Sequence, residues 1–322
     1  MTRKVVMRVA KGAFGLILLG IVVLQLDPDE LAPLIKRGDP WWLACSVASF
    51  AAALCVFQAL RLHVLIAHYT ASLRTSIRLF FIGAFFNNLL PSNVGGDAMR
   101  LYYLSKQRGV GWAGPMSLLL LHRVSGLFAM LLGFAVYLAL EGSRFFALAT
   151  NAGVRINAPT PWMVLVSLTL LFVFVLLVYA TRRTKLGHKV YERISATLSQ
   201  ARAAIGELST ASMLHLAWLT IFFHGARMLG FYFAVGYLGQ SIALWDLIPV
   251  LTLTAIMALL PITVGGLGLV EGSVGVGLQM FGVSASASIA AALINRAVMV
   301  FTALIGGMLY ATEQGPQTDS AS

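Results

Sequence analysis

The stretch Leu89-Leu90-Pro91-Ser92-Asn93-Val94-Gly95-Gly96 occurs a second time as Leu259-Leu260-Pro261-Ile262-Thr263-Val264-Gly265-Gly266, 170 residues further along the chain. Upstream of it, Phe57-Gln58-Ala59-Leu60-Arg61 parallels Phe223-His224-Gly225-Ala226-Arg227. Downstream, Leu120-Leu121-His122-Arg123 parallels Leu293-Ile294-Asn295-Arg296. Three matches in the same order and at nearly constant spacing predict two related halves.

Each half is predicted to contain a helix with an arginine, a broken apolar hairpin and a second helix with an arginine. The apolar limbs before the breaks run over residues 77–90 and 247–260. Fourteen helical residues span only about 21 Å, which is less than the roughly 30 Å of a hydrocarbon core. Proline removes a backbone donor and the glycine pair permits a tight reversal. We therefore expect hairpins that turn inside the membrane, with a kinked full span as the alternative.

Composition places the chain in a membrane. Hydrophobic residues make up 59% of its 322 positions, charged residues only 11%, and the mean hydropathy is +0.84. Soluble domains carry about a quarter charged residues. Stretches that approach or exceed the roughly 20 apolar residues of a bilayer crossing lie at 13–26, 41–60, 113–140, 161–180, 211–238 and 286–311. The expected fold is an all-α integral membrane protein with about six full transmembrane helices and two re-entrant helical hairpins, arranged as an inverted repeat.

The net charge of +11 reports topology rather than a nucleic-acid partner. If the loops alternate from an inner N-terminus, fourteen Lys and Arg lie in inner segments and four in outer ones. This asymmetry follows the positive-inside rule, so the first hairpin is entered from the cytoplasm and the second from outside. We expect a cytoplasmic N-terminus and an uncleaved first span. The expected divisions are 1–40 (first span and outer loop), 41–140 (first repeat), 141–210 (connecting span and basic segment), 211–312 (second repeat) and 313–322 (disordered tail).

Five arginines fall in apolar context, where a charge is a functional candidate by default. Arg123 and Arg296 lie about ten residues into their helices, roughly 15 Å from either end. They are candidates for ligand binding, for structural pairs with Asp97 or Glu271, or for both. Arg61 and Arg227 lie nearer to helix ends, so snorkelling to the interface is their alternative role.

Acidic residues are fewer in these segments. Asp97 and Arg100 are expected to share one face of a helix that begins just past the first break, where Asp97 is also a good N-cap. The five intramembrane arginines (Arg61, Arg100, Arg123, Arg227 and Arg296) outnumber Asp97 and Glu271 by three. Backbone N–H groups at Gly95, Gly96, Gly265 and Gly266 would add positive potential. The interior is therefore expected to hold an anion, most simply a phosphate.

Other features are weaker. The stretch Lys185–Leu208 fits either an amphipathic helix on anionic lipid or a solvated loop. Cys45 and Cys55 and the scattered histidines are expected to pack rather than to bind metal. The sequence contains no nucleotide loop, no G-x-S-x-G and no acidic cluster for a metal-dependent transferase. We expect no cofactor, no metal and no catalytic residue.

Residues 87–100, which run from Asn87 to Arg100 through the first break, resemble the N-x-x-L-P-x-x-x-G-G-D-x-x-R motif of the lysylphosphatidylglycerol synthase transmembrane family. Residues 261–271 resemble its second motif, P-x-x-x-G-G-x-G-x-x-E, and Arg296 stands where an arginine follows in that family. The resemblance covers roughly residues 10–312. That family includes the flippase domain of the multiple peptide resistance factor, which moves aminoacylated phosphatidylglycerol between leaflets, and stand-alone proteins with proposed roles in lipid movement.

The resemblance implies lipid translocation. No soluble aminoacyl-transfer domain follows residue 312, so we expect no synthesis of lysyl-lipid. The expected protein is a flippase-like transporter of the bacterial inner membrane, not an enzyme, which moves an anionic phospholipid or a polyprenyl-phosphate-linked lipid. The protein partners considered are a second copy of the chain, which would give a homodimer, and a lipid-synthesis protein. The expected substrate-binding residues are Arg61, Asn88, Gly95, Gly96, Asp97, Arg100, Arg123, Arg227, Gly265, Gly266, Glu271 and Arg296.

Two rivals to transport stay open. An integral-membrane transferase acting on a lipid phosphate would use Asp97 or Glu271 as its general base. A non-catalytic membrane scaffold would keep the fold and tolerate the loss of Asp97 or Arg296.

Overall fold

A computed structural model describes residues 28–70, 72–89, 95–106, 112–151, 199, 203–260 and 263–312. Within these ranges the regular elements are helices, and no strand occurs. Several expectations lie outside the described residues: the first span at 13–26, the span at 161–180, most of the basic segment and the tail at 313–322. The described part therefore tests four of the six expected spans.

Those four spans are long apolar helices. The first runs over Pro40–Thr70 as α3 (Pro40–Ala51), the π-helical turn η1 (Ala52–Phe57) and α4 (Gln58–Thr70), and it follows the short helix α2 (Pro28–Arg37). The others are α7 (Ala113–Asn151), α10 (Thr210–Tyr237) and α13 (Ala285–Ala311). Each is long and apolar enough to cross a membrane. The expected spans at 41–60, 113–140, 211–238 and 286–311 are thus helices.

Six shorter elements form two helical hairpins. The first pairs α5 (Leu73–Leu89) with α6 (Gly95–Lys106). The second pairs α11 (Leu247–Leu259) with α12 (Leu269–Met280), with the 3-10 turns η2 (Leu244–Asp246) before it and η3 (Val264–Gly266) inside it. The limb expected at 77–90 is longer than predicted, because α5 begins at Leu73. The first turn of α5 contains polar residues, so the apolar pattern of the sequence begins only after it.

The limbs of each hairpin are antiparallel. In the first, a hydrogen bond from Arg100 reaches the Phe80 carbonyl, whereas Gly96 lies against Gly83, so one limb ascends as the other descends. In the second, Ser273 bonds Thr254 and Gly277 lies against Val250. Residues 90–94 and 261–262 of the two breaks lie outside the described part.

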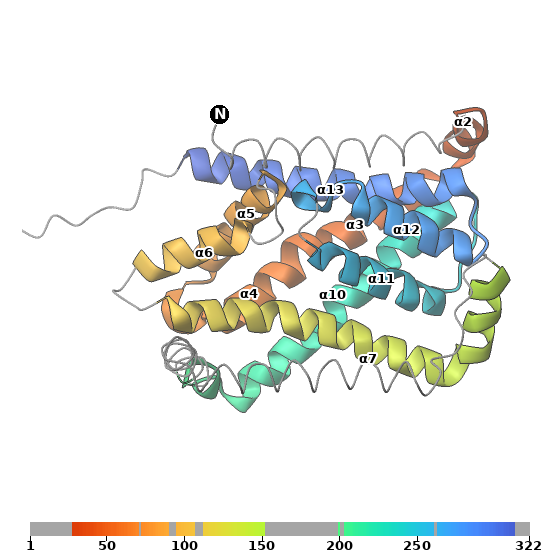
Figure 1. Cartoon of the computed structure of the whole chain (residues 1–322). Coiled ribbons are helices and arrows are strands. Elements are labelled where there is room, and N and C mark those ends of the chain that lie inside the picture. Colours follow the sequence, from red (N-terminus) through yellow and green to blue (C-terminus); the bar gives the residue numbers. More distant parts are fainter. Residues whose placement is uncertain are drawn as a thin grey trace, which may run out of the picture.

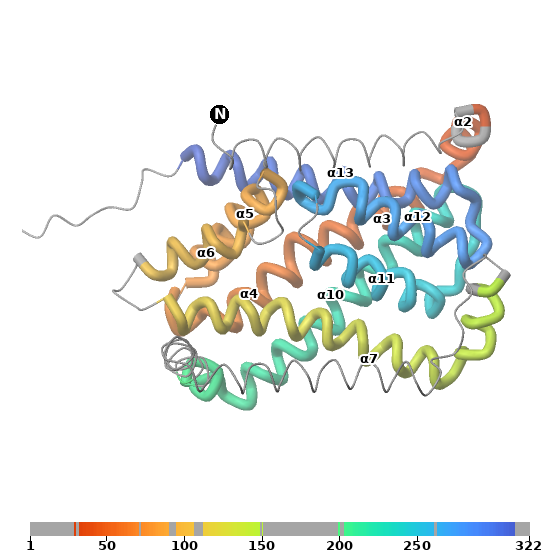
Figure 2. The backbone as a smooth tube through the Cα atoms, in the orientation of Figure 1, coloured from red at the N-terminus to blue at the C-terminus, as the bar shows by residue number. Residues whose placement is uncertain are grey.

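The hairpins open toward opposite ends of the helix bundle, and the described ends of their limbs approach each other near its middle (Figure 1). η3 packs against the end of α5. A side chain at Gly265, whose φ is +58°, would lie 3.2 Å from the Cα atom of Asn88. α7 and α13 run in opposite directions along opposite sides of the bundle (Figure 2). This is the geometry expected of an inverted repeat.

Each hairpin packs against a helix of the other half. α5 lies along α13, where Gly306 meets the Phe81 carbonyl oxygen so closely that no side chain fits between them. In the reciprocal pair α11 lies along α7, and the Thr252 hydroxyl donates to the Met130 carbonyl at 3.3 Å. α10 packs on α3 and α4 between the two pairs. The halves are therefore interlocked rather than placed side by side.

A buried carboxylate fixes the base of the second hairpin to α7. Asp246, 2% exposed, accepts hydrogen bonds from the Tyr137 hydroxyl at 2.9 Å and from Arg144 Nη2 at 2.8 Å. Glu141 departs from helical geometry at φ −124°, and the resulting kink in α7 lies between Tyr137 and Arg144. Asp246 therefore holds α7 on both sides of its bend, through the Tyr137 hydroxyl on one side and Arg144 on the other.

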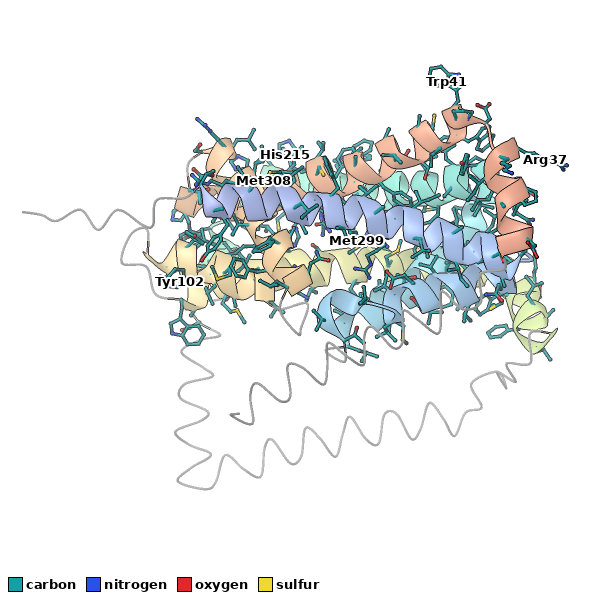
Figure 3. The ribbon with its side chains drawn as sticks, turned by 90° about the horizontal axis from the view of Figure 1, so that it is seen from above. Arg37, Trp41, Tyr102, His215, Met299 and Met308 are labelled. Atoms are coloured by element: carbon teal, nitrogen blue, oxygen red, sulfur yellow. The ribbon has the colours of Figure 1, made fainter. Side chains whose placement is uncertain are left out.

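The outer surface of the long helices is apolar. Leu120, Val124, Phe128 and Leu131 recur at helical spacing on α7 and are 43–62% exposed. At one end of the bundle Trp41, 77% exposed, points outward near Arg37 (Figure 3). Indole rings at such positions are typical of the membrane–water boundary. The described part is therefore that of an all-helical, multi-pass membrane protein.

Candidate functional site

A cavity of about 320 Å³ lies where the described limbs of the two hairpins meet the long helices. Both halves contribute to its wall, which is made by η1, α4, α5, α6, α7, α10, α11, η3 and α13. The polar and charged residues that line it are Gln58, Arg61, Asn87, Asn88, Asp97, Arg100, His122, Arg123, His224, Arg227 and Thr302. A largely apolar bundle thus encloses one concentrated polar centre.

Asp97 organises one side of the cavity. It stands in the first turn of α6, and its Oδ1 accepts from Arg100 Nη1 at 2.7 Å. Its Oδ2 accepts from Arg123 Nε on α7, so one carboxylate joins the hairpin to the neighbouring long helix. Arg100 also donates to the Phe80 carbonyl at 3.1 Å, and its side chain is 6% exposed. The Arg123 side chain is 28% exposed and is the more open of the two to the cavity.

Arg61 joins three helices through neutral acceptors. Its Nε donates to the Thr220 hydroxyl at 3.0 Å and its Nη1 to Gln58 Oε1 at 3.1 Å. Its Nη2 donates to the His122 carbonyl and to the Ser125 hydroxyl, both at 3.0 Å. The residue is 1% exposed. Snorkelling is therefore wrong for Arg61, because its acceptors lie on α7 and α10 inside the bundle.

Arg227, the repeat counterpart of Arg61, reaches the same cavity from α10. Its guanidinium carbon lies 5.8 Å from the centre of the Phe223 ring, and that of Arg61 lies 5.2 Å from the same ring. Among the described residues, no carboxylate or hydrogen-bond acceptor pairs with Arg227. Snorkelling is wrong here too, and Arg227 presents an uncompensated charge to the cavity.

Glu271 and Arg296 form a buried pair away from the cavity wall. Glu271 is 1% exposed; its Oε2 accepts from the Gly268 N–H at 2.7 Å, and its Oε1 accepts from Arg296 Nε. Arg296 Nη1 donates to the Gly265 carbonyl at 3.1 Å. Together they cap α12 and hold η3 in its turn. Of the two roles expected for Arg296, ligand binding and a structural pair with an acid, the geometry supports the structural pair.

The cavity wall holds seven of the twelve expected binding residues: Arg61, Asn88, Asp97, Arg100, Arg123, Arg227 and Gly265. It does not include Gly95, Gly96, Gly266, Glu271 or Arg296. The expectation that Gly96 offers its N–H to a ligand is wrong, because that N–H donates to Asn87 Oδ1 at 2.7 Å. The sequence did not predict five polar wall residues, although all lie within the repeated or neighbouring apolar segments: Gln58, Asn87, His122, His224 and Thr302.

Asn87 caps α6 from the preceding helix, and its removal is expected to be measurable. Asn87→Ala leaves the Gly96 N–H without its acceptor and should lower the free energy of unfolding by about 1 kcal/mol, the usual value of a helix N-cap. Thermal unfolding of the purified protein in detergent measures the effect. Asn87→Asp keeps an acceptor oxygen and serves as the conservative control. Equal melting temperatures for Asn87→Ala and the wild type would contradict this role.

Comparison with known proteins agrees with this architecture. The sequence profile described as lysylphosphatidylglycerol synthase TM region matches residues 8–307. A curated relative, a UPF0104 membrane protein of Methanothermobacter thermautotrophicus (strain Delta H), is 23% identical over 315 residues, covering 88% of each chain. No solved structure matches. Because the profile extends over nearly the whole chain, the protein belongs to the lysylphosphatidylglycerol synthase transmembrane family.

Proposed function

We propose that this protein is a flippase-like transporter that moves an anionic phospholipid or a polyprenyl-phosphate-linked lipid across the bacterial inner membrane. One observation carries the proposal: among the residues that the structure describes, four arginines and a single acid line the cavity between the two opposed hairpins. Guanidinium groups bind phosphate through paired N–H donors, and a buried group of them is costly without an anion. Sites of this kind, near the meeting point of inverted repeats, are typical of transporters.

In this proposal the headgroup occupies the cavity while the acyl chains stay in the bilayer. The exposed apolar stripe on α7, which includes Leu120 and Phe128, offers a surface for those chains next to the cavity residue Arg123. The hairpins are re-entrant, the N-terminus is cytoplasmic, and the chain crosses the membrane about six times. Rocking of one half against the other exposes the cavity to each side in turn.

The two acids named as general bases for the rival transferase, Asp97 and Glu271, are both engaged in other contacts. Both oxygens of Asp97 accept hydrogen bonds from arginines, and Glu271 is buried off the cavity wall with both of its oxygens engaged. A general base needs an oxygen within reach of the substrate proton. Translocation requires no such group, so the contacts favour it.

Reconstitution in liposomes tests the proposal. With labelled anionic lipid in one leaflet, the wild type should accelerate movement to the other leaflet. Arg123→Ala should slow it by about tenfold or more, because one charge-assisted contact is worth about 1.5–3 kcal/mol. Arg37→Gln, which changes an exposed arginine at the end of the bundle, is the matched control. Equal rates for wild type and Arg123→Ala would refute transport through this cavity, and a new lipid product on addition of a donor would favour the transferase.

A further inference from the structure

The charge of the cavity wall discriminates among anionic headgroups. Within the described residues, Arg61, Arg100, Arg123 and Arg227 line the cavity, and Asp97 is the one acid among them. The wall therefore carries an excess of three positive charges. Residues 90–94 and 261–262, the undescribed parts of the two adjacent breaks, contain no ionisable side chain.

The excess is concentrated on two of the four arginines. Asp97 accepts hydrogen bonds from both Arg100 and Arg123. In contrast, Arg61 donates only to neutral acceptors, and Arg227 has no acceptor among the described residues. The guanidinium carbons of Arg61 and Arg227 lie 5.2 Å and 5.8 Å from the centre of the Phe223 ring, so two like charges are close to one aromatic side chain. An anion that lies close to both guanidinium groups would offset their mutual repulsion in this weakly polar interior.

The number of negative charges on the ligand then decides how well the cavity is neutralised. A phosphodiester headgroup carries one negative charge. A terminal phosphomonoester carries close to two at neutral pH, with three acceptor oxygens, and a diphosphate carries more. Resting on the proposed function, we infer that this site selects lipids whose headgroup ends in a phosphomonoester or diphosphate over phosphodiester lipids.

The same contacts disfavour a cationic headgroup. A carboxylate is the acceptor that compensates the charge of an ammonium group, and both Asp97 oxygens are already bonded by arginines. Glu271, the remaining acid near the hairpin turns, is 1% exposed and absent from the cavity wall. Aminoacylated or ethanolamine headgroups would bring a further positive charge into a cavity that already has an excess of positive charges.

Arg227, whose charge has no acceptor among the described residues, is accordingly the residue that sets the preference for headgroups of higher negative charge.

Binding to lipids with identical dioleoyl chains tests the inference on the full chain in nanodiscs of phosphatidylcholine. Phosphatidic acid carries a monoester, phosphatidylglycerol a diester and phosphatidylethanolamine an ammonium group. The wild type should bind phosphatidic acid about tenfold or more tightly than phosphatidylglycerol, with phosphatidylethanolamine weakest. Arg227→Gln should reduce the preference for the monoester to about threefold or less, whereas Arg227→Lys, which keeps the charge, should retain most of it. Arg37→Gln should leave the preference unchanged.

A soluble arm separates a lipid site from a site for free phosphate. Glycerol 3-phosphate has the same monoester without acyl chains, so it should compete with phosphatidic acid only at much higher concentration; equal competition would overturn the assignment to a lipid. Equal affinities for phosphatidic acid and phosphatidylglycerol would overturn the inference even if both are transported. Conversely, preserved selectivity without movement of any labelled lipid would refute the proposed transport and leave the binding preference standing.

Discussion

Glu271→Ala is expected to destabilise the protein by about 3–5 kcal/mol, the usual loss when one partner of a buried ion pair is removed. Arg296, whose side chain is 8% exposed, would keep its charge without a carboxylate. The Gly268 N–H would also lose its acceptor at the start of α12. We expect a lower melting temperature in detergent and faster proteolysis near η3, the turn that Arg296 holds through the Gly265 carbonyl.

A double variant distinguishes loss of the pair from loss of packing. Glu271→Leu combined with Arg296→Met removes both charges and keeps similar volumes, and such replacements are often neutral in stability. The double variant should therefore recover much of the stability that Glu271→Ala loses. A melting temperature of Glu271→Ala equal to that of the wild type, or a double variant less stable than either single one, would contradict the structural role of the pair.

Gly306→Ala is expected to disrupt the packing of α13 on α5. The added methyl group would overlap the Phe81 carbonyl oxygen and lie 3.1 Å from Phe85 Cβ. Because the obstacle is backbone, relief requires the two helices to separate, and the destabilisation should reach the upper end of the roughly 1–3 kcal/mol typical of overpacking. Folded yield after size-exclusion chromatography and thermal unfolding both report the change.

Two other glycines are matched controls for Gly306. Gly225, on α10, has nothing within 4 Å of an added methyl group. Gly225→Ala should be neutral or slightly stabilising, because alanine favours a helix over glycine by about 0.5–1 kcal/mol. Gly307→Ala meets only the Phe85 ring, a side chain that is able to rotate, and should fall between the other two. A Gly306→Ala protein as stable as Gly225→Ala would show that α5 and α13 do not pack this closely.

The sequence predicts much of the architecture because that part depends on local pattern. Apolar length places the four long helices, and the Pro and Gly-Gly breaks separate the limbs of the hairpins. The spacing of Asp97 and Arg100 correctly places them on one helical face, where they form an ion pair. These features involve residues close to one another in the chain, so periodicity and spacing are enough to predict them.

The site is less predictable because it depends on contacts between distant helices. Arg61 and Arg227 are equivalent by repeat, yet Arg61 bonds Thr220 and Ser125 whereas Arg227 bonds no described acceptor. Arg123 and Arg296 are also equivalent, but only Arg123 faces the cavity. In the second half Glu271 and Arg296 neutralise each other, and nothing in the spacing of either residue distinguishes that pair from the Asp97 cluster.

The packing of each hairpin on the other half also sets the order in which the chain can be assembled. The surface of α5 that meets α13 is synthesised more than two hundred residues before its partner at Ala285–Ala311. Until α13 has been synthesised, the surface of α5 that will contact it must be covered by lipid or by the insertion machinery. The first hairpin therefore gains its packing partner only when α13, the last described helix, has been made. A chain that ends before α13 leaves the packing face of α5 without that partner.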